Sequence, residues 1–177
     1  INFLSENLVN EGTLSITTGT ANAQFPLDNI KNESTTKKFR STGNTVVIEV
    51  DLGQTRTIDT IALVGHAVDG LGVTALSVKT SVTTDFSGST PIALTLSQEF
   101  NMGWEFITEV SHRYVELTFT GNGSYCEVSN IFIGERINLA LNSYSIGSFR
   151  YRQDDRSESR TNDYGQQFSN ILNFRKR

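Results

Sequence analysis

Side chains that could carry catalysis are few in this sequence of 177 residues. It contains two histidines, His66 and His112, and one cysteine, Cys126. Their neighbours form neither the nucleophile elbow of a hydrolase nor a metal-ligand spacing, so no acid, base and nucleophile are assembled along the chain. The sequence leaves open whether carboxylates from distant strands meet. We therefore expect a protein that is not an enzyme.

His66 and Cys126 also have structural explanations. His66 follows an apolar run, and a histidine at the end of a strand most often bonds a backbone carbonyl; contact with a ligand or an interface is the alternative. Cys126 starts the segment CEVSNIFIG and is expected to be buried as a small hydrophobe. A single cysteine excludes an internal disulfide and a multi-cysteine zinc site.

The composition is that of a folded chain, with 19% charged residues and a net charge of -4. Nucleic acid is not an expected partner, because proteins that bind it are usually basic. No apolar run approaches the roughly 18 residues that a membrane span needs. Residues 1–10 lack the basic start and the apolar length of a signal peptide, although a leader removed before this numbering is left open.

Charge and aromatic rings are unevenly distributed along the chain. Residues 1–134 carry 7 Lys and Arg against 14 Asp and Glu, whereas residues 135–177 carry 8 against 5. Disordered tails are poor in aromatic residues, and aromatics mixed with arginine are typical of interface cores. We predict that residues 135–177 form an arm, with strands around a polar turn near residues 154–163, that packs on another subunit; a charged surface hairpin is the alternative. The predicted interface residues are Tyr144, Phe149, Arg150, Tyr151, Arg152, Tyr164, Phe168 and Phe174.

The elements before residue 134 are predicted to be strands. Residues 46–50 alternate between apolar and other side chains, residues 52–55 turn the chain, and residues 58–64 form a second, buried strand that should lie with the first in the sheet core. A tight turn or one helical turn is expected in residues 25–30. Phe39, alone in a polar stretch, is expected to plug the end of a sandwich. Alternation predicts further strands at residues 14–18, 74–82, 92–96 and 104–107.

A hairpin is predicted near the end of this region. Residues 113–120 alternate, residues 121–124 contain the glycine and asparagine of a primed turn, and residues 125–133 return. About eight strands with short loops, and no convincing helical periodicity, indicate an all-β fold. The predicted domains are therefore an antiparallel jelly-roll β-sandwich at residues 1–134 and the arm at residues 135–177.

Several landmarks of this region resemble a known family when they are taken in order. They are Asp28 and Asn29 in a polar loop, then Thr35, Thr36, Phe39 and Ser41, then IEVDLG at residues 48–53, residues 58–63, residues 112–117 and the closing strand 128–134. The order is similar to that of the discoidin or coagulation-factor C-type group of galactose-binding-like domains. In physical terms, Leu52 can plug the core, Gly53 permits a tight turn and Asp51 can accept backbone N–H groups.

The resemblance implies two kinds of site. Where members bind calcium, a loop and a glutamate near the closing strand supply oxygens, which here indicates Asp28, Asn29 and Glu127. These are fewer than the roughly six to eight oxygens that calcium takes, so no cofactor is expected and calcium is the alternative. Sugar-binding sites offer an exposed aromatic and a side chain that holds hydroxyls, here Trp104 with Arg40 and His66, although no spacing brings them together.

A narrower resemblance concerns IALVGH at residues 61–66, IFIG at residues 131–134 and the arginine-rich aromatic tail. These segments look like those of minor tail or tail-tip proteins of tailed bacteriophages. The leading hypothesis is therefore a non-catalytic attachment protein of a phage virion, with other virion proteins and copies of itself as partners. The alternative is an extracellular carbohydrate-binding, lectin-like module that contacts a cell-surface glycan.

Overall fold

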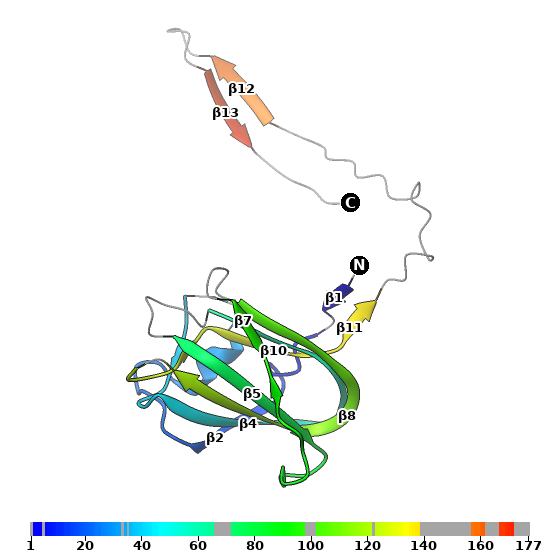
Figure 1. The fold of residues 1–177 in the computed structure, drawn as a ribbon. Coiled ribbons are helices and arrows are strands. Elements are labelled where there is room, and N and C mark those ends of the chain that lie inside the picture. The colour runs from blue at the N-terminus through cyan, green and yellow to red at the C-terminus, as the bar shows by residue number, and fades with distance from the viewer. Residues whose placement is uncertain are drawn as a thin grey trace. The chain divides into compact units, whose positions relative to one another are not determined.

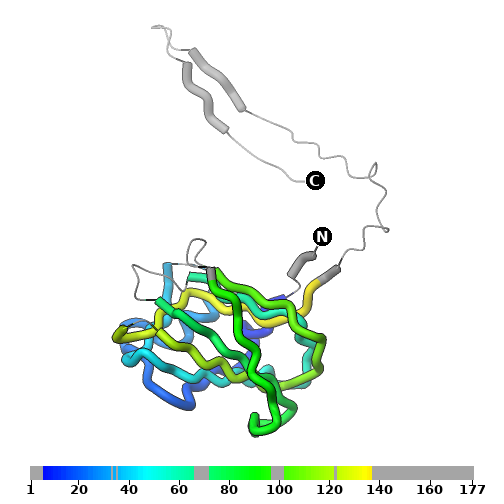
Figure 2. Tube along the Cα trace, viewed as in Figure 1, coloured from blue at the N-terminus to red at the C-terminus, as the bar shows by residue number. Residues whose placement is uncertain are grey.

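Two long strands form the centre of the structure, a computed structural model. β4 (Thr45–Val64) pairs antiparallel with β8 (Met102–Gly121) over nearly the whole length of both. Both strands bend midway, and the bend of β8 is visible in the ribbon (Figure 1) and in the Cα trace (Figure 2). One antiparallel pair therefore contributes to both layers of a sandwich.

Each half of this pair has its own neighbours. In one layer, β2 (Thr13–Thr18) pairs with the first half of β4, β5 (Val73–Ser81) pairs with the second half of β8, and β6 (Ile92–Ala93) pairs with β5. In the other, β10 (Asn130–Gly134) pairs with the second half of β4, and β7 (Thr95–Ser97) pairs with the first half of β8. The predicted all-β antiparallel sandwich is confirmed.

Shorter elements lie at the ends of the long strands. β1 (Asn2–Leu4) pairs with β11 (Arg136–Asn138), and β3 (Phe39–Arg40) pairs with β9 (Glu127–Val128). The 3-10 helix η1 (Leu27–Lys31) supplies the helical turn that the sequence predicts.

The core lies between the two layers and is filled by alternate residues of the long strands. Val46, Ile48 and Val50 of β4 are fully buried, and so are Val115 and Leu117 of β8. Residues between them in β4 are half-buried, as a period of two requires. The predicted alternation of residues 46–50 is confirmed, as are the strands at residues 14–18 and 74–82, which are β2 and β5.

An ion pair holds the bend of β4. Between the paired positions of Asp51 and Arg56, β4 has four residues, 52–55, where β8 has one, Arg113. The carboxylate of Asp51 accepts hydrogen bonds from Nε and Nη2 of Arg113 at 2.7 and 2.8 Å, and from the backbone N–H of Gly53 at 2.8 Å. Gly53 has a φ of 76°, in the left-handed region that favours glycine. Asp51 accepts a backbone N–H as predicted, whereas Gly53 serves a bend inside β4 and not the predicted tight turn.

Two predicted breaks between strands are absent from the structure. The turn predicted at residues 52–55 is a bend inside β4, in which Leu52 is buried with 7% of its surface exposed. The strands predicted at residues 104–107 and 113–120 are both parts of β8. In each case a bulge changes the direction of a strand without ending it, and a bulge has no strong sequence signal.

The predicted hairpin of residues 113–133 is wrong. β8 lies between β4 and β5, whereas the segment after it pairs with β3 through β9 and with β4 through β10. Local turn chemistry favours a hairpin there, but the long-range pairing of β10 with β4 buries Ile131 and Ile133 completely. Burial of two such side chains contributes several kcal/mol in all, at about 1.5–3 kcal/mol each, and outweighs a local turn preference.

The structure describes residues 2–4, 6–32, 34, 36–65, 72–97, 102–121, 123–138, 157–161 and 167–171. Phe39, predicted to plug the sandwich, is completely buried. Among the described residues, no helix has the length and the apolar character needed to cross a membrane.

The chain divides into two units, Asn2–Asn138 and a second one made of Leu139–Arg177 with Ile1. The first unit extends beyond the predicted boundary at residue 134, because β11 pairs with β1. In the second unit, β12 (Ser157–Thr161) pairs antiparallel with β13 (Gln167–Ile171), so part of the predicted turn is a strand.

One of the predicted interface residues, Phe168, lies in β13 opposite Arg160. The function of this second unit as an arm between subunits stays a prediction. The other predicted interface residues lie outside the described residues: Tyr144, Phe149, Arg150, Tyr151, Arg152, Tyr164 and Phe174.

Replacing the acid at the bend should weaken the fold in a pH-dependent way. The hydrogen bond from Arg113 lowers the pKa of Asp51, against a smaller opposing effect of burial. A carboxyl group of this kind stabilises the folded state above its ordinary pKa of 3.8 and loses that contribution as the pH falls through the lower folded pKa. Asp51→Asn should therefore lower the Tm at neutral pH and reduce the further loss of Tm below about pH 4.

Thermal melts of the wild type and of Asp51→Asn from neutral to acidic pH measure this difference. Glu49→Gln is the matched control, because Glu49 lies in the same strand and forms no ion pair with a described residue. Parallel pH profiles for wild type and Asp51→Asn would contradict the role given to the ion pair.

Candidate functional site

The first half of β8 exposes three large apolar side chains in a row. Met102, Trp104 and Phe106 are 37%, 48% and 42% exposed, whereas Gly103 and Ile107 on the opposite face are buried. Large side chains normally occupy the inner face of a half-buried strand. Here the inner face begins with a glycine, and the large residues lie outside.

The neighbouring strands extend this apolar surface. Ala62 of β4 is opposite Trp104, and Phe132 of β10 is opposite Ala62. In the next row, Val64 is opposite Met102. These neighbours are half-buried. We call the surface formed by Met102, Trp104, Phe106, Ala62, Val64 and Phe132 the outer apolar face.

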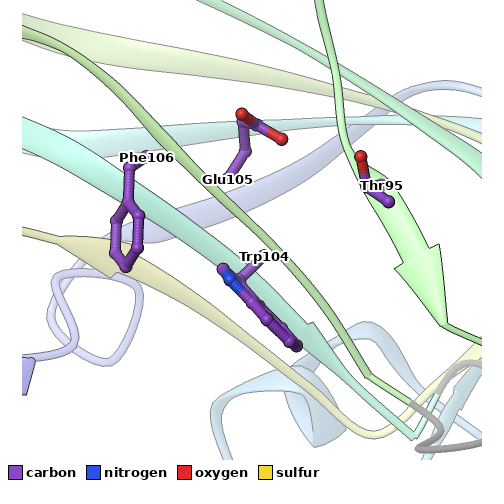
Figure 3. A pocket seen from close by; sticks show the side chains of 4 residues that line it. All are labelled: Thr95, Trp104, Glu105 and Phe106. Carbon is purple, nitrogen blue, oxygen red and sulfur yellow. The ribbon is translucent and has the colours of Figure 1, made fainter.

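A hollow of about 290 Å³ lies at the edge of β8, lined by Thr95, Trp104, Glu105 and Phe106 (Figure 3). In Figure 3 both rings project to the same side of β8, and Glu105 projects to the other side. The hollow lies where β7 leaves β8. β7 follows β8 only as far as Thr95 opposite Trp104, and the preceding Leu94 donates its N–H to Leu76 of β5 instead. The strand predicted at residues 92–96 is accordingly split into β6 and β7.

Phe106 is held in place from one side. The guanidinium carbon of Arg136 lies 5.1 Å from the centre of the Phe106 ring, within the range of a cation–π contact. Nε of Arg136 lies 3.1 Å from Oδ2 of Asp59, and the backbone N–H of Arg136 donates to Oδ1 of Asp59 at 2.8 Å. Asp59 is buried, with 5% of its surface exposed. The ring is therefore positioned by an arginine whose charge is already neutralised.

The electrostatics of the hollow are acidic. Of the described residues that line it, Glu105 carries a charge, and it forms no hydrogen bond or ion pair with another described residue. The described lining of the hollow thus combines two aromatic rings, a hydroxyl and a carboxylate that has no partner among the described residues. Such a surface suits a ligand that has an apolar face and hydrogen-bonding groups at its rim.

Arg40, predicted from the sequence as a ligand-binding residue, lies in a different cluster. Its guanidinium carbon is 4.3 Å from the ring centres of both Phe25 and Tyr125. Nε of Arg40 donates to Oε2 of Glu127 at 2.8 Å, and Nζ of Lys38 donates to Oε1 at 2.8 Å. These contacts tie β3 to β9, and a role of Arg40 in ligand binding stays a prediction.

Glu127 is a buried anion with two cationic partners. Its residue surface is 3% exposed. Burial raises the pKa of Glu127, but the hydrogen bonds from Lys38 and Arg40 outweigh that effect, so the pKa lies below its ordinary value. The carboxylate is therefore ionised at neutral pH and fully engaged by its partners.

The three residues predicted as calcium ligands do not offer a suitable oxygen set. Glu127 is occupied by Lys38 and Arg40, and Asn29 donates its side-chain amide to the carbonyl of Lys38 at 2.8 Å. Asp28 lies in the first turn of η1. Within the described part of the chain, no group of three or more His, Cys, Asp or Glu residues could hold a metal ion. Calcium binding remains a prediction that this donor set does not favour.

The other residues singled out in the sequence are also placed. Cys126 is buried, and burial raises the pKa of its thiol, against a smaller opposing effect of a hydrogen bond from Ser41, so it is a weak nucleophile. Nδ1 of His112 lies 2.8 Å from Oγ1 of Thr80. His66 lies outside the described residues. The structure therefore places Trp104 at the hollow and Arg40 elsewhere.

Sequence reasoning missed Thr95, Glu105 and Phe106 as residues of the site. A signal was present for Phe106, because Met102, Trp104 and Phe106 alternate with small or polar residues. This pattern describes one apolar face of a strand, but it does not tell whether that face is inside or outside.

The comparisons with known proteins agree at the level of fold. No family model matches the sequence, and no curated protein matches it. The chain is similar to the chitosan-binding module 1 of a chitosanase/glucanase from Paenibacillus sp. IK-5, with a TM-score of 0.56 and 16% identity over 74% of this chain and 100% of that one. It is similar to the family 32 carbohydrate-binding module of NanJ from C. perfringens in complex with galactose, with a TM-score of 0.58 and 12% identity over 77% of this chain and 100% of that one.

A third similar structure is a fucolectin from the serum of Morone saxatilis, the striped bass. Its TM-score is 0.59 at 10% identity, over 73% of this chain and 47% of that one. The fold of this chain is therefore the discoidin-like, galactose-binding-like β-sandwich, and the family resemblance seen in the sequence is confirmed as a resemblance of fold. The phage-tail context gains no support from these structures.

Removing the buried acid of the Arg40 cluster should destabilise the protein. Glu127→Ala leaves Lys38 and Arg40 without their anion beside a buried surface, and we expect a loss of about 2–4 kcal/mol in the free energy of unfolding. Chemical denaturation measures this loss. The control is Glu116→Ala, which removes the partner of Lys79 at 3.1 Å in a more exposed ion pair and should cost less than about 1 kcal/mol. Equal losses would contradict a structural role for the Arg40 cluster.

Proposed function

We propose that this chain is a non-catalytic carbohydrate-binding module that holds a glycan against Trp104 and Phe106. The observation that carries the proposal is the exposure of both rings beside a hollow, in a fold whose similar structures include a chitosan-binding module and a complex with galactose. A sugar ring has an apolar C–H face, which can stack on an aromatic ring, and hydroxyl groups around it. Thr95, which is opposite Trp104 in the pairing of β7 with β8, can supply a hydroxyl group for a hydrogen bond at the rim.

The site is suited to binding because its rings are already ordered. Trp104 lies in a strand that is paired on both sides, with Ala62 and with Thr95. Phe106 is held by Arg136. Ordered side chains lose less conformational entropy when a ligand binds, so more of the contact energy appears as affinity.

We prefer the hypothesis of a glycan-binding module to the hypothesis of a virion protein, which the sequence favoured. The similar structures include carbohydrate-binding proteins, which supports the alternative that the sequence also offered. An extracellular location and a cell-surface or polymeric glycan as partner follow from it. The virion role has no comparable support.

Truncating the exposed tryptophan should weaken binding while the fold persists. We expect Trp104→Ala to reduce glycan affinity about ten-fold or more, because it removes the largest contact of the site. Isothermal titration or a glycan array with and without calcium measures the affinity, and the melting curve checks the fold. Val82→Ala is the control, because Val82 is 58% exposed and does not line the hollow. If Trp104→Ala binds the same glycans with the same affinity as the wild type, the proposal is wrong.

The second unit is proposed to mediate contact between copies of the chain, as its ring and arginine content predicts. A two-stranded hairpin is marginally stable by itself, so β12 and β13 would gain stability from a partner. A chain ending at Asn138 should keep the melting temperature of the sandwich but lose any oligomer seen with the full chain. Native mass spectrometry of both chains measures this, and an unchanged assembly state would contradict the proposal.

A further inference from the structure

We infer that the outer apolar face binds the surface of a solid, uncharged polysaccharide such as crystalline cellulose, in preference to a single soluble chain. The inference rests on the proposed function and adds the physical state and the charge of the glycan. Three features of the face support it: its composition, the contacts of its polar side chains, and its size.

The face carries no charge over three rows of three residues. In an antiparallel sheet, residues directly opposite each other place their side chains on the same side. The rows are Asn130, Val64 and Met102, then Phe132, Ala62 and Trp104, then Gly134, Thr60 and Phe106. β7 extends the first two rows with Ser97 and Thr95, which are also uncharged. A charged ligand would lose its water on this face without gaining an ionic partner from these residues.

Two charged residues border the face without changing its character. Glu105 projects to the side of β8 opposite both rings (Figure 3), so its charge lies off the face. Arg136 contacts the ring of Phe106, but its Nε lies 3.1 Å from Oδ2 of Asp59, which neutralises it. The face therefore favours a neutral ligand.

The polar side chains within the rows are already bonded inside the protein. The amide of Asn130 donates to the carbonyl of Ile30 at 3.0 Å, and the hydroxyl of Thr60 donates to Oδ1 of Asp59 at 2.7 Å. A site for one soluble sugar chain normally includes a few polar groups that bond its hydroxyls. The centre of this face offers apolar contact instead, which suits the C–H faces of sugar rings packed side by side.

The apolar side chains extend in two directions. Met102, Trp104 and Phe106 follow β8 over about 13 Å, at about 3.3 Å per residue. The four adjacent strands give the face a width of about 14 Å, at about 4.8 Å between strands. One chain lying along β8 would leave Phe132 and Val64 in water. The surface of a solid polysaccharide presents several chains side by side and covers both directions.

The size of the face opposes a second copy of this chain as the occupant. Its two dimensions give an area of the order of 200 Å², whereas each partner in a stable protein interface buries about 800 Å². Residues 1–134 carry 14 Asp and Glu against 7 Lys and Arg, so two such units also repel each other. A small face is sufficient on a solid, because a repeating surface offers many equivalent positions at high local concentration.

Depletion of the full-length chain from solution by microcrystalline cellulose tests the inference. The chain should be retained on the solid, and an equal mass of soluble cellohexaose should release less than about a tenth of it. Sodium chloride should not weaken retention, because no charged contact is screened. Sodium sulfate should strengthen it, because this salt favours the burial of apolar surface.

Met102→Glu isolates the contribution of the face beyond the hollow. Met102 is 37% exposed and is not among the described residues that line the hollow. A carboxylate there should reduce retention about ten-fold or more, because contact with the solid would remove its water. Val82→Glu is the matched control, since Val82 is 58% exposed and follows β5 in the other layer. Melting curves of both variants check the fold.

The outcomes separate this inference from the proposed function. Soluble glycan binding that depends on Trp104, without retention on cellulose, overturns the inference and leaves the glycan-binding function standing. Retention that Met102→Glu and Val82→Glu weaken equally also overturns it, and so does a dimer that Met102→Glu dissociates in a chain that cellulose does not retain. Absence of binding to any glycan, soluble or solid, overturns both.

Discussion

The unbroken pairing of β4 with β8 through a bend is the constraint on which the rest of the structure depends. If the two strands ended at the bend, each layer would need its own central pair. Because they continue, the first layer determines the register of the second, and Val46 and Leu63 enter one common core. The contacts of Asp51 with Arg113 and Gly53 at the bend set how one half turns over the other. A local interaction at the surface thus has a structural effect on both layers.

The exposed rings are a consequence of the same arrangement. β8 is accompanied by β7 up to Trp104 and by β5 from Tyr114 onward, so the described strands leave its edge uncovered between these two points. The hollow lies at the first end of this gap, beside Trp104. The chain that precedes β7 leaves β8 at this point, because Leu94 donates its N–H to Leu76 of β5. The same bending that closes the core therefore leaves a site at the edge.

The sequence predicted the strands where the pattern was local. The alternation at residues 46–50 needed no information from distant residues, whereas the turn predicted from Asp51, Leu52 and Gly53 is a bend inside β4. The wrong predictions concern which strands pair with each other. Residues 113–133 have the local features of a hairpin, but β10 pairs with β4 instead. Pairing over long sequence distances depends on which surfaces are buried together, and a single sequence does not contain that information directly.

The contrast between Arg40 and Trp104 shows the same limit for the site. Both residue types are common in sugar-binding sites, and no feature of the sequence distinguishes between them. In the structure, Arg40 has an anion in Glu127 and two ring contacts, so part of its binding capacity is used within the protein. Trp104 is 48% exposed at the edge of the hollow, so its capacity is open to a ligand. Whether a side chain stabilises the fold or binds a ligand depends on the charges and rings that its neighbours already offer it. Which residues become its neighbours depends on the pairing of strands that are far apart in the sequence.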